Sequence, residues 1–260
     1  TGYSREEVLG QNPRILQSGR QDDEFYAQMW KKLLATGHWY GDIWDRRKDG
    51  SIYPKYLSIS VIRNAAGEAS HYSGIFYDIS ERKTVEERLD RLAHYDLLTG
   101  LPNRSLLMDR LEQAAERALR NGQCVGLLFL DLDHFKEVND TLGHSAGDAL
   151  LKEMAERMKS CVRAVDTVAR LGGDEFVVLV PDISDREDLG GVRIIKVNAI
   201  APPCWLDGRT VVTFASIGIS VFPNDTRDTQ ELIRYADAAM YRVKQAGRGF
   251  YQFYNPKGEY

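Results

Sequence analysis

The stretch Arg170-Leu171-Gly172-Gly173-Asp174-Glu175-Phe176, followed by the apolar run Val177 to Val180, decides the fold of this chain. Two adjacent glycines can adopt the positive φ angles that a two-residue hairpin loop requires, and strand-forming residues flank them. The pattern predicts a β-hairpin with Asp174 and Glu175 at its tip. Carboxylates that a ligand can approach closely form a site for a hard cation or a general base, and the alternative is a solvated acidic turn.

A second acidic segment follows a strand that is predicted to be buried. The run Val125-Gly126-Leu127-Leu128-Phe129-Leu130 is continuously apolar, as is typical of a strand covered on both faces, and it ends in Asp131-Leu132-Asp133. Acids at the end of a buried strand lie at the edge of the sheet. If this strand pairs beside the hairpin, Asp131 and Asp174 converge on one divalent ion. Oxygen ligands without a nearby His or Cys cluster favour Mg²⁺ or Mn²⁺ over zinc.

Basic residues surround the end of a predicted helix. Apolar residues recur at helical spacing over residues 229–246, and Gly247 predicts the end of the helix. Lys244 and Arg248 flank this end, where capping of the helix dipole is the alternative to a binding role. Beside acidic metal ligands, a lysine and an arginine supply the point charge and the planar fork that a triphosphate needs. Lys136, which follows the second acidic segment, is expected to add a third cation.

Further blocks occur in the same part of the chain. They are Asp96-Leu97-Leu98-Thr99-Gly100-Leu101-Pro102-Asn103-Arg104, Asn139-Asp140, Gly143-His144, Gly147-Asp148 and Ala215-Ser216-Ile217-Gly218. In order and spacing, all these blocks together resemble the GGDEF domain of diguanylate cyclases over about residues 95–255. The resemblance implies an α+β fold, a ferredoxin-like domain of the palm type with a central, mostly antiparallel sheet flanked by helices. It also implies an enzyme that joins two GTP molecules into cyclic di-GMP and releases two pyrophosphates.

The resemblance implies a role for each matching residue. Asp131, the Leu132 carbonyl, Asp174 and Glu175 correspond to ligands of Mg²⁺ or Mn²⁺, with two ions for each GTP. Asp174 is the candidate that accepts the proton of the attacking 3′-hydroxyl, and a shared role for Glu175 stays open. The residues expected to bind the substrate are Lys136, Asn139, His144, Asp148, Lys244 and Arg248.

Guanine recognition is assigned to Asn139 and Asp148. A carboxylate accepts hydrogen bonds from the N1 and N2 donors of guanine, and an asparagine supplies one donor and one acceptor. His144 matches a residue near the nucleoside. Helix-start and turn chemistry is the alternative for all three. Because each 3′-hydroxyl must attack the other nucleotide, two such domains are expected to face each other in a homodimer.

A product-binding site is implied just before the hairpin. Arg163-Ala164-Val165-Asp166 has the R-x-x-D form and the spacing of the family's inhibitory site for cyclic di-GMP. Arg163 and Asp166 are therefore expected to bind the product, with ordinary surface charges as the alternative. Arg193 is a candidate secondary contact.

The first 80 residues have a different pattern. Asp49-Gly50 between alternating runs predicts a hairpin in an antiparallel sheet, and together with Gly37-His38-Trp39-Tyr40-Gly41 and the segment Gly74 to Ser80 it resembles a PAS sensor domain. Two strands of such a domain are expected to precede Thr1. Asn12-Pro13-Arg14-Ile15-Leu16-Gln17 is similar to the flavin-binding photoreceptor motif, but Pro13 replaces the reactive Cys, so no flavin adduct is expected.

Haem is not expected in this region either. His38 and His71 are predicted to be structural or exposed. The aromatic residues predicted to lie in the core are Trp39, Trp44, Phe76 and Tyr77.

A linker helix is predicted over residues 81–95, between a PAS-like domain at 1–80 and a GGDEF domain at 96–256. Val85, Leu89 and Leu92 are spaced four and three apart, as in a short coiled coil. The hypothesis is a dimerising helix that sets the orientation of the two cyclase domains. The alternative is a helix packed on its own domain.

Composition is consistent with this organisation. A chain of 260 residues with 43% hydrophobic residues can form two cored domains, and the net charge of −4 argues against a nucleic-acid partner. Three scattered cysteines, Cys124, Cys161 and Cys204, are typical of a reducing cytosol. No membrane segment or signal peptide is evident. A cytoplasmic location is therefore expected, with the alternative that the chain is the cytosolic part of a larger, membrane-attached protein.

The sequence therefore predicts a PAS-linked diguanylate cyclase that is inhibited by its product. The alternative is a GTP-binding GGDEF module without turnover, in a hybrid protein with a downstream cyclic di-GMP phosphodiesterase domain. The ending Phe250-Tyr251-Gln252-Phe253-Tyr254-Asn255-Pro256 resembles the junction in such hybrids.

Overall fold

The computed structural model describes residues 1–186, 189, 200, 202–206 and 208–256. The chain folds into two compact units, Thr1–Leu89 and Asp90–Tyr260. Among the described residues, no helix is both long enough and apolar enough to span a bilayer.

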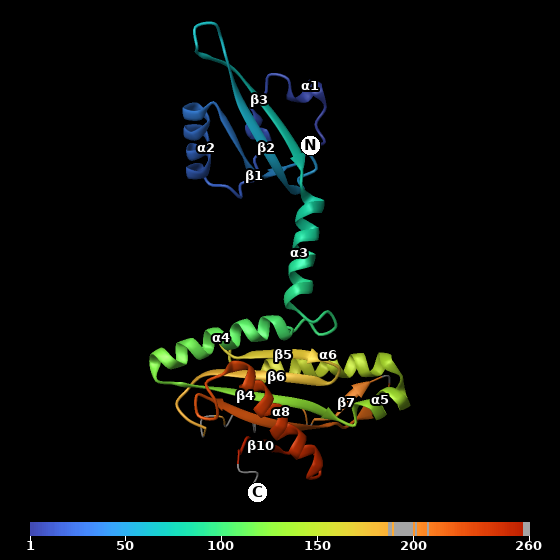
Figure 1. The fold of residues 1–260 in the computed structure, drawn as a ribbon. Coiled ribbons are helices and arrows are strands. Elements are labelled where there is room, and N and C mark those ends of the chain that lie inside the picture. The colour runs from blue at the N-terminus through green and yellow to red at the C-terminus, as the bar shows by residue number, and fades with distance from the viewer. Residues whose placement is uncertain (187–188, 190–199, 201, 207, 257–260) are drawn as a thin grey trace. The chain divides into compact units, whose positions relative to one another are not determined.

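The amino-terminal unit contains a three-stranded antiparallel sheet in chain order (Figure 1). Its strands are β1 (His38–Arg46), β2 (Ile52–Arg63) and β3 (Ala69–Asp78). The helices before the sheet are α1 (Arg5–Val8), the 3-10 helix η1 (Pro13–Leu16) and α2 (Asp23–Thr36). The predicted hairpin is confirmed, since Asp49 and Gly50 lie between β1 and β2 and Gly50 has a φ of +88°.

The core of this unit is small and lies between α2 and one face of the sheet. Trp39 and Ile43 of β1 are buried there, and Trp44 is half-buried. The prediction was wrong for Phe76 and Tyr77, whose exposed fractions are 41% and 64%. Both lie on β3, an edge strand whose ten residues are all exposed. An apolar pattern predicts a strand, but it does not reveal whether another layer covers the strand.

The predicted linker helix is α3 (Ser80–His94), and none of its residues is buried. The apolar stripe of Val85, Leu89 and Leu92 is 50%, 59% and 44% exposed. Among the described residues, this stripe does not pack into a core. The alternative, a helix packed on its own domain, would bury it.

The carboxy-terminal unit is built on one sheet with the strand order β10-β9-β4-β6-β5. Its strands are β4 (Cys124–Asp133), β5 (Thr167–Gly172), β6 (Glu175–Ile183), β9 (Phe214–Phe222) and β10 (Tyr251–Phe253). All pairs are antiparallel except β9 with β10, and the order of the four long strands is that of a ferredoxin-like sheet. A separate small hairpin joins β7 (Cys204–Leu206) to β8 (Arg209–Val211). The predicted α+β fold is confirmed.

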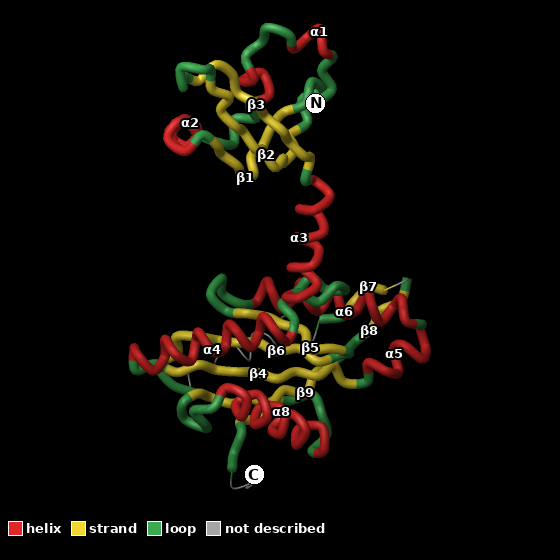
Figure 2. The backbone as a smooth tube through the Cα atoms, turned by 45° about the horizontal axis from the view of Figure 1, so that its top comes forward, coloured by secondary structure: helices red, strands yellow, loops and turns green. Residues whose placement is uncertain are grey.

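Helices cover both faces of this sheet (Figure 2). They are α4 (Arg104–Asn121), α5 (Phe135–Leu142), α6 (His144–Cys161) and α8 (Thr229–Gln245). All ten residues of β4 are buried, as the apolar run predicts. Leu128 and Leu130 pack on the α6 side, whereas Leu127 and Phe129 pack on the side of α4 and α8. Odd-numbered side chains of β4 therefore face α8.

Helix α8 lies in direct backbone contact with β9. A Cβ atom added to Gly218 would lie 1.9 Å from the Ala236 carbonyl oxygen and 2.2 Å from the Met240 nitrogen. Only a glycine fits at this position of the strand, so the distance from α8 to the sheet is fixed by the absence of a side chain.

Candidate active site

The Gly-Gly hairpin forms as predicted. Gly172 pairs with Glu175 between β5 and β6, so Gly173 and Asp174 are the two turn residues. The φ angles of Gly172 and Gly173 are +150° and +53°, which favour glycine. Asp174 lies in the turn, and Glu175 begins β6.

A clamp that the sequence analysis missed holds the hairpin turn. Arg170 donates to the Gly173 carbonyl through Nε at 3.0 Å and Nη2 at 2.7 Å, and its Nη1 donates to Asp96 at 2.9 Å. Asp96 Oδ1 also accepts from the Thr99 hydroxyl at 2.6 Å. These charge-assisted bonds fix the backbone that carries Asp174. The Asp96 block was recognised as a motif, but its partner 74 residues away is set only by the fold.

The two acidic segments meet at the end of the sheet. Asp131 of β4 is the cross-strand partner of Glu175, and the Leu132 N–H donates to the Asp174 carbonyl at 3.3 Å. Asp131 is 6% exposed, which makes it one of the few buried charged residues of this unit. The structure therefore brings the segments that carry Asp131 and Asp174 together at this end of the sheet.

Lys244, in the last turn of α8, contacts this acidic group. Its Nζ lies 2.7 Å from Asp131 Oδ2. Burial raises the pKa of Asp131, the hydrogen bond from Lys244 opposes this rise, and the negative charge of Asp174 adds to it. Burial, followed by the charges of Asp237 and Asp174, also raises the pKa of Glu175. The site concentrates negative charge and already binds one cation, the lysine ammonium.

The donor set fits a hard divalent ion only in part. Asp131, Glu175 and the Leu132 carbonyl offer oxygen ligands at one strand end. Among the described residues, however, no group of three or more acidic, His or Cys side chains is close enough to hold an ion. An ion here would replace Lys244 at Asp131 and take its remaining ligands from the substrate.

Asp133 is a second residue that the sequence analysis left without a role. It lies on the same side of β4 as Asp131 and is 4% exposed. Its carboxylate accepts from the Ser216 hydroxyl at 2.8 Å and from the Gly249 N–H at 3.0 Å. Arg248 Nε lies 3.8 Å from Asp133 Oδ1. The two-residue spacing to Asp131 was the signal that pointed to this side of the strand.

The predicted guanine-binding residues lie on the helix pair after β4. A Cβ atom added to Gly147 of α6 would lie 1.9 Å from Asn139 Oδ1. The Asn139 side chain of α5 therefore packs directly against Gly147. Asp148 follows Gly147 and is exposed, as are His144 and Lys136. The structure therefore brings Asn139 next to the segment that carries Asp148, and it leaves the polar groups of this region open to a ligand.

This geometry agrees with what is found in known proteins. The family description "Diguanylate cyclase, GGDEF domain" matches residues 93–249, and "PAS domain" matches residues 1–81. The chain belongs to the GGDEF family. Its amino-terminal region is a PAS domain.

Curated and solved relatives support the assignment to the GGDEF family. The bifunctional diguanylate cyclase/cyclic di-GMP phosphodiesterase MucR of Pseudomonas aeruginosa is 48% identical over 170 residues, 65% of this chain and 25% of MucR. The crystal structure of the TpbB GGDEF domain, also from P. aeruginosa, has a TM-score of 0.59 and 40% identity and covers 60% of this chain and 98% of that one. A sensory box/GGDEF protein of Caulobacter crescentus has a TM-score of 0.56 and 42% identity, with 60% and 100% covered. The chain spans about a quarter of the length of curated relatives such as MucR.

The R-x-x-D segment of this GGDEF domain forms a closed turn. Asp166 Oδ2 accepts from the Arg163 backbone N–H at 2.8 Å and lies 3.7 Å from Arg163 Nε. The Asp166 side chain is 6% exposed and that of Arg163 is 61% exposed. A pocket of about 290 Å³ beside the turn is also lined by Arg110 and Arg117 of α4, which the sequence analysis missed. Arg193 lies outside the described residues.

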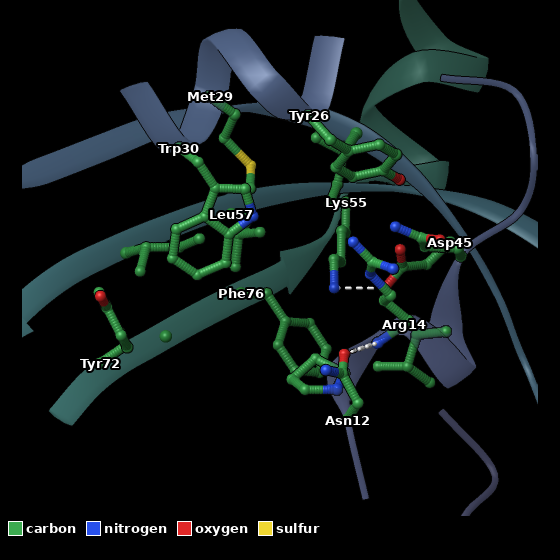
Figure 3. A pocket seen from close by; sticks show the side chains of 16 residues that line it. Asn12, Arg14, Tyr26, Met29, Trp30, Asp45, Lys55, Leu57, Tyr72 and Phe76 are labelled. Atoms are coloured by element: carbon green, nitrogen blue, oxygen red, sulfur yellow. Dashed lines mark hydrogen bonds and ion pairs between the residues drawn. The ribbon is translucent and has the colours of Figure 1, made fainter. Parts of the chain in front are cut away.

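The PAS domain contains a separate cavity of about 630 Å³ (Figure 3). Apolar side chains, among them Trp30 and Leu57, line one part of it. Asp45 and Lys55 form a buried ion pair in another part, near Arg14 and Tyr26. The Tyr26 hydroxyl is buried without a hydrogen-bond partner among the described residues. His38 and His71 are exposed on the sheet and do not line this cavity.

Proposed function

We propose that this chain is a diguanylate cyclase that condenses two GTP molecules into cyclic di-GMP and two pyrophosphates. The observation that carries the proposal is the meeting of Asp131, Asp174 and Glu175 with Lys244 at one end of the sheet. An intact acidic hairpin beside a lysine provides both the proton acceptor and the cation that phosphoryl transfer needs.

The reaction needs the residues of this site in distinct roles. Lys244 and Arg248, with Lys136, offset charge on the triphosphate, while Asn139 and Asp148 hold guanine and His144 lies near the nucleoside. The 3′-hydroxyl of the other GTP forms a bond to the α-phosphorus as the bond to pyrophosphate breaks, and its proton passes to Asp174 or Glu175. The raised pKa of Glu175 makes it a better proton acceptor than an ordinary glutamate.

Divalent ions complete the site. Diguanylate cyclases of this family generally use them. In this chain, Asp131, the Leu132 carbonyl, Asp174 and Glu175 would hold Mg²⁺ or Mn²⁺, which supplies positive charge to the triphosphate. With an ion at Asp131, Lys244 would be free to contact phosphate oxygens.

Catalysis is proposed to occur in a homodimer, because one domain holds one GTP and each hydroxyl attacks the other nucleotide. The exposed stripe of Val85, Leu89 and Leu92 on α3 supports a coiled-coil contact between two copies. Replacing Leu89 and Leu92 with serine is expected to shift sedimentation toward monomer and to lower specific activity most at low protein concentration. An active variant with unchanged association would argue against this contact.

Two forms of control are proposed. Cyclic di-GMP binds at Arg163 and Asp166 and inhibits the enzyme, supported by the exposed guanidinium and the basic pocket beside it. Arg163→Ala is then expected to reduce inhibition by added cyclic di-GMP with little change in initial rate. The PAS cavity offers a place at which a small-molecule signal acts on the cyclase.

A second candidate function is GTP sensing without turnover. It is favoured by relatives that are named cyclic di-GMP phosphodiesterases, NbdA of P. aeruginosa and PdeR of Escherichia coli, at 42% and 38% identity. Incubation with GTP and Mg²⁺, followed by chromatography of the products, separates the two functions. Formation of cyclic di-GMP supports the cyclase, whereas GTP binding without any product supports the sensor.

A further inference from the structure

Both carboxylate oxygens of Asp133 are held by hydrogen bonds from the protein. Oδ1 accepts from the Ser216 hydroxyl at 2.8 Å, and Oδ2 accepts from the Gly249 N–H at 3.0 Å. Each oxygen therefore has a partner within the protein. This distinguishes Asp133 from Asp131, which is paired with the movable side chain of Lys244.

The turn that Asp133 contacts has an unusual backbone. Gly247, Arg248 and Gly249 have φ angles of +118°, +64° and +70°. This conformation is ordinary for glycine, but in arginine it brings the Cβ atom too close to the backbone. Such a conformation persists only where its surroundings hold it. The bond from Gly249 to Asp133 does so on one side, and the bond from the Arg248 N–H to the Val243 carbonyl at 3.0 Å does so on the other.

The side chain of Arg248 is oriented by the same carboxylate. Its Nε faces Asp133 Oδ1 at 3.8 Å, while its terminal nitrogens make no hydrogen bond or ion pair with another described residue. The side chain is 50% exposed, so without an anchor it would sample many rotamers. Contact at Nε leaves the outer fork of the guanidinium free for phosphate oxygens.

We infer that Asp133 is a positioning residue, which holds the turn at residues 247–249 and the Arg248 side chain in the pose that binds the triphosphate. This inference rests on the proposed function, because it concerns the same site. Asp133 acts through Arg248 and does not touch the substrate. Its removal is expected to weaken the contact with the β- and γ-phosphates and to leave guanine binding intact, since Asn139 and Asp148 lie on other elements.

The test measures binding without turnover. GTP that lacks the 3′-hydroxyl cannot attack, so titration calorimetry with 3′-deoxy-GTP and Mg²⁺ reports affinity alone, and GMP reports the part that does not depend on the outer phosphates. Asp133→Ala is expected to lower the affinity for 3′-deoxy-GTP about tenfold and the affinity for GMP less than about twofold. Ser220→Ala is the control. Like Ser216, Ser220 is a buried serine of β9, but it donates to the Leu232 carbonyl and not to Asp133. This variant should change neither affinity.

A double-mutant cycle separates positioning from general damage to the fold. In an Arg248→Ala background, Asp133→Ala is expected to lower the affinity for 3′-deoxy-GTP less than about twofold. The guanidinium through which Asp133 acts is absent from that background. Additive losses, or an equal loss of GMP affinity, would overturn the inference. If Asp133→Ala does not fold, Asp133→Asn keeps one carbonyl acceptor, and about a threefold loss with the same coupling is expected. An unchanged affinity for 3′-deoxy-GTP in that variant would overturn it as well.

Cyclase assays of the parent protein distinguish this inference from the proposed function. If the variants show the coupled loss of 3′-deoxy-GTP affinity but the parent forms no cyclic di-GMP, the positioning role is supported and the cyclase is rejected. Product formation with additive losses would support the cyclase and reject the positioning role. A parent that does not bind 3′-deoxy-GTP would reject both.

Discussion

Each unit contains a buried aspartate paired with a lysine, and the two pairs differ in what surrounds them. Asp45 and Lys55 are diagonal neighbours on β1 and β2, and their side chains are 4% and 6% exposed. Asp131 and Lys244 join a strand end to a helix end, and Lys244 is 28% exposed. Burial raises the pKa of both aspartates, although a lysine opposes the rise in each case.

The difference lies in the neighbouring charges. Asp131 has Glu175 as its cross-strand partner and Asp174 nearby, so the charge around it would also attract a divalent cation. Asp45 has no second acidic residue among those lining its cavity, and its lysine is sealed in place. A buried pair with further acids is therefore suited to exchange partners, whereas a buried pair without them is suited to remain closed.

The largest expected effect breaks the closed pair. Lys55→Met leaves Asp45 buried without its cation and should lower the free energy of unfolding of the PAS domain by about 3–5 kcal/mol. Denaturant unfolding followed by tryptophan fluorescence reports mainly this domain, because it contains three of the four tryptophans, Trp30, Trp39 and Trp44. The double variant Asp45→Leu/Lys55→Met should recover much of the loss. A single variant as stable as the parent would show that the pair is not closed.

The next effect breaks the exchangeable site. Asp131→Asn and Asp174→Asn should each lower the rate of cyclic di-GMP formation by about two decades or more, because metal ligands act mainly on the charged transition state. Binding of 3′-deoxy-GTP should weaken less, since the guanine contacts remain. Asp182→Asn, an exposed position at the far end of β6, is the control. Near-normal turnover of either active-site variant would reject the metal assignment.

A smaller effect sharpens the boundary of that site. Asp148→Ala should raise the Michaelis constant for GTP and narrow its preference over ATP, at a cost of about 1–3 kcal/mol for the lost guanine contact. Steady-state kinetics with both nucleotides provide the test. Glu156→Ala on the same helix changes an exposed acid that pairs with Lys159 and should leave the preference intact. Unchanged discrimination in Asp148→Ala would reject this guanine site.

The smallest effect concerns pH and the PAS domain alone. Hydrogen bonds from Ser80 and the charge of Arg47 lower the pKa of Asp78 to about 2, so its stabilising contribution should be lost as the pH falls from 3.8 to about 2. The pKa of Asp45 is raised, so its ionised form opposes folding and its contribution should become more favourable as the pH falls toward 3.8. Unfolding of Asp78→Ala and Asp45→Asn across pH 2.5–5 should therefore differ from the parent with opposite pH trends. Parallel trends would contradict both assignments.

Local patterns predicted most of the elements that build the site. Gly172 and Gly173 at the hairpin adopt a backbone conformation that few other residues adopt. The apolar run of β4 can only be a covered strand or helix, and the spacing over residues 229–246 specifies a helix. These features depend on residues within one element, so the sequence reveals them.

Contacts between elements were not predictable in the same way. The partners of Asp96 and Asp133 lie 74 and 83 residues away in the chain, and only the tertiary fold brings them together. The exposure of Phe76 and Tyr77 likewise depends on which layer covers β3, which the pattern of the strand itself does not contain.

Gly218 fixes how closely α8 approaches β9 at the candidate active site. Because a single methyl group there would collide with the backbone of α8, the helix cannot keep its present distance from β9 if Gly218 is replaced by even the smallest side chain. Lys244 is carried at the end of that helix, more than two turns beyond Ala236, so any shift at Gly218 is transmitted to its contact with Asp131. The spacing between Lys244 and Asp131 is therefore set by a position that has no side chain at all.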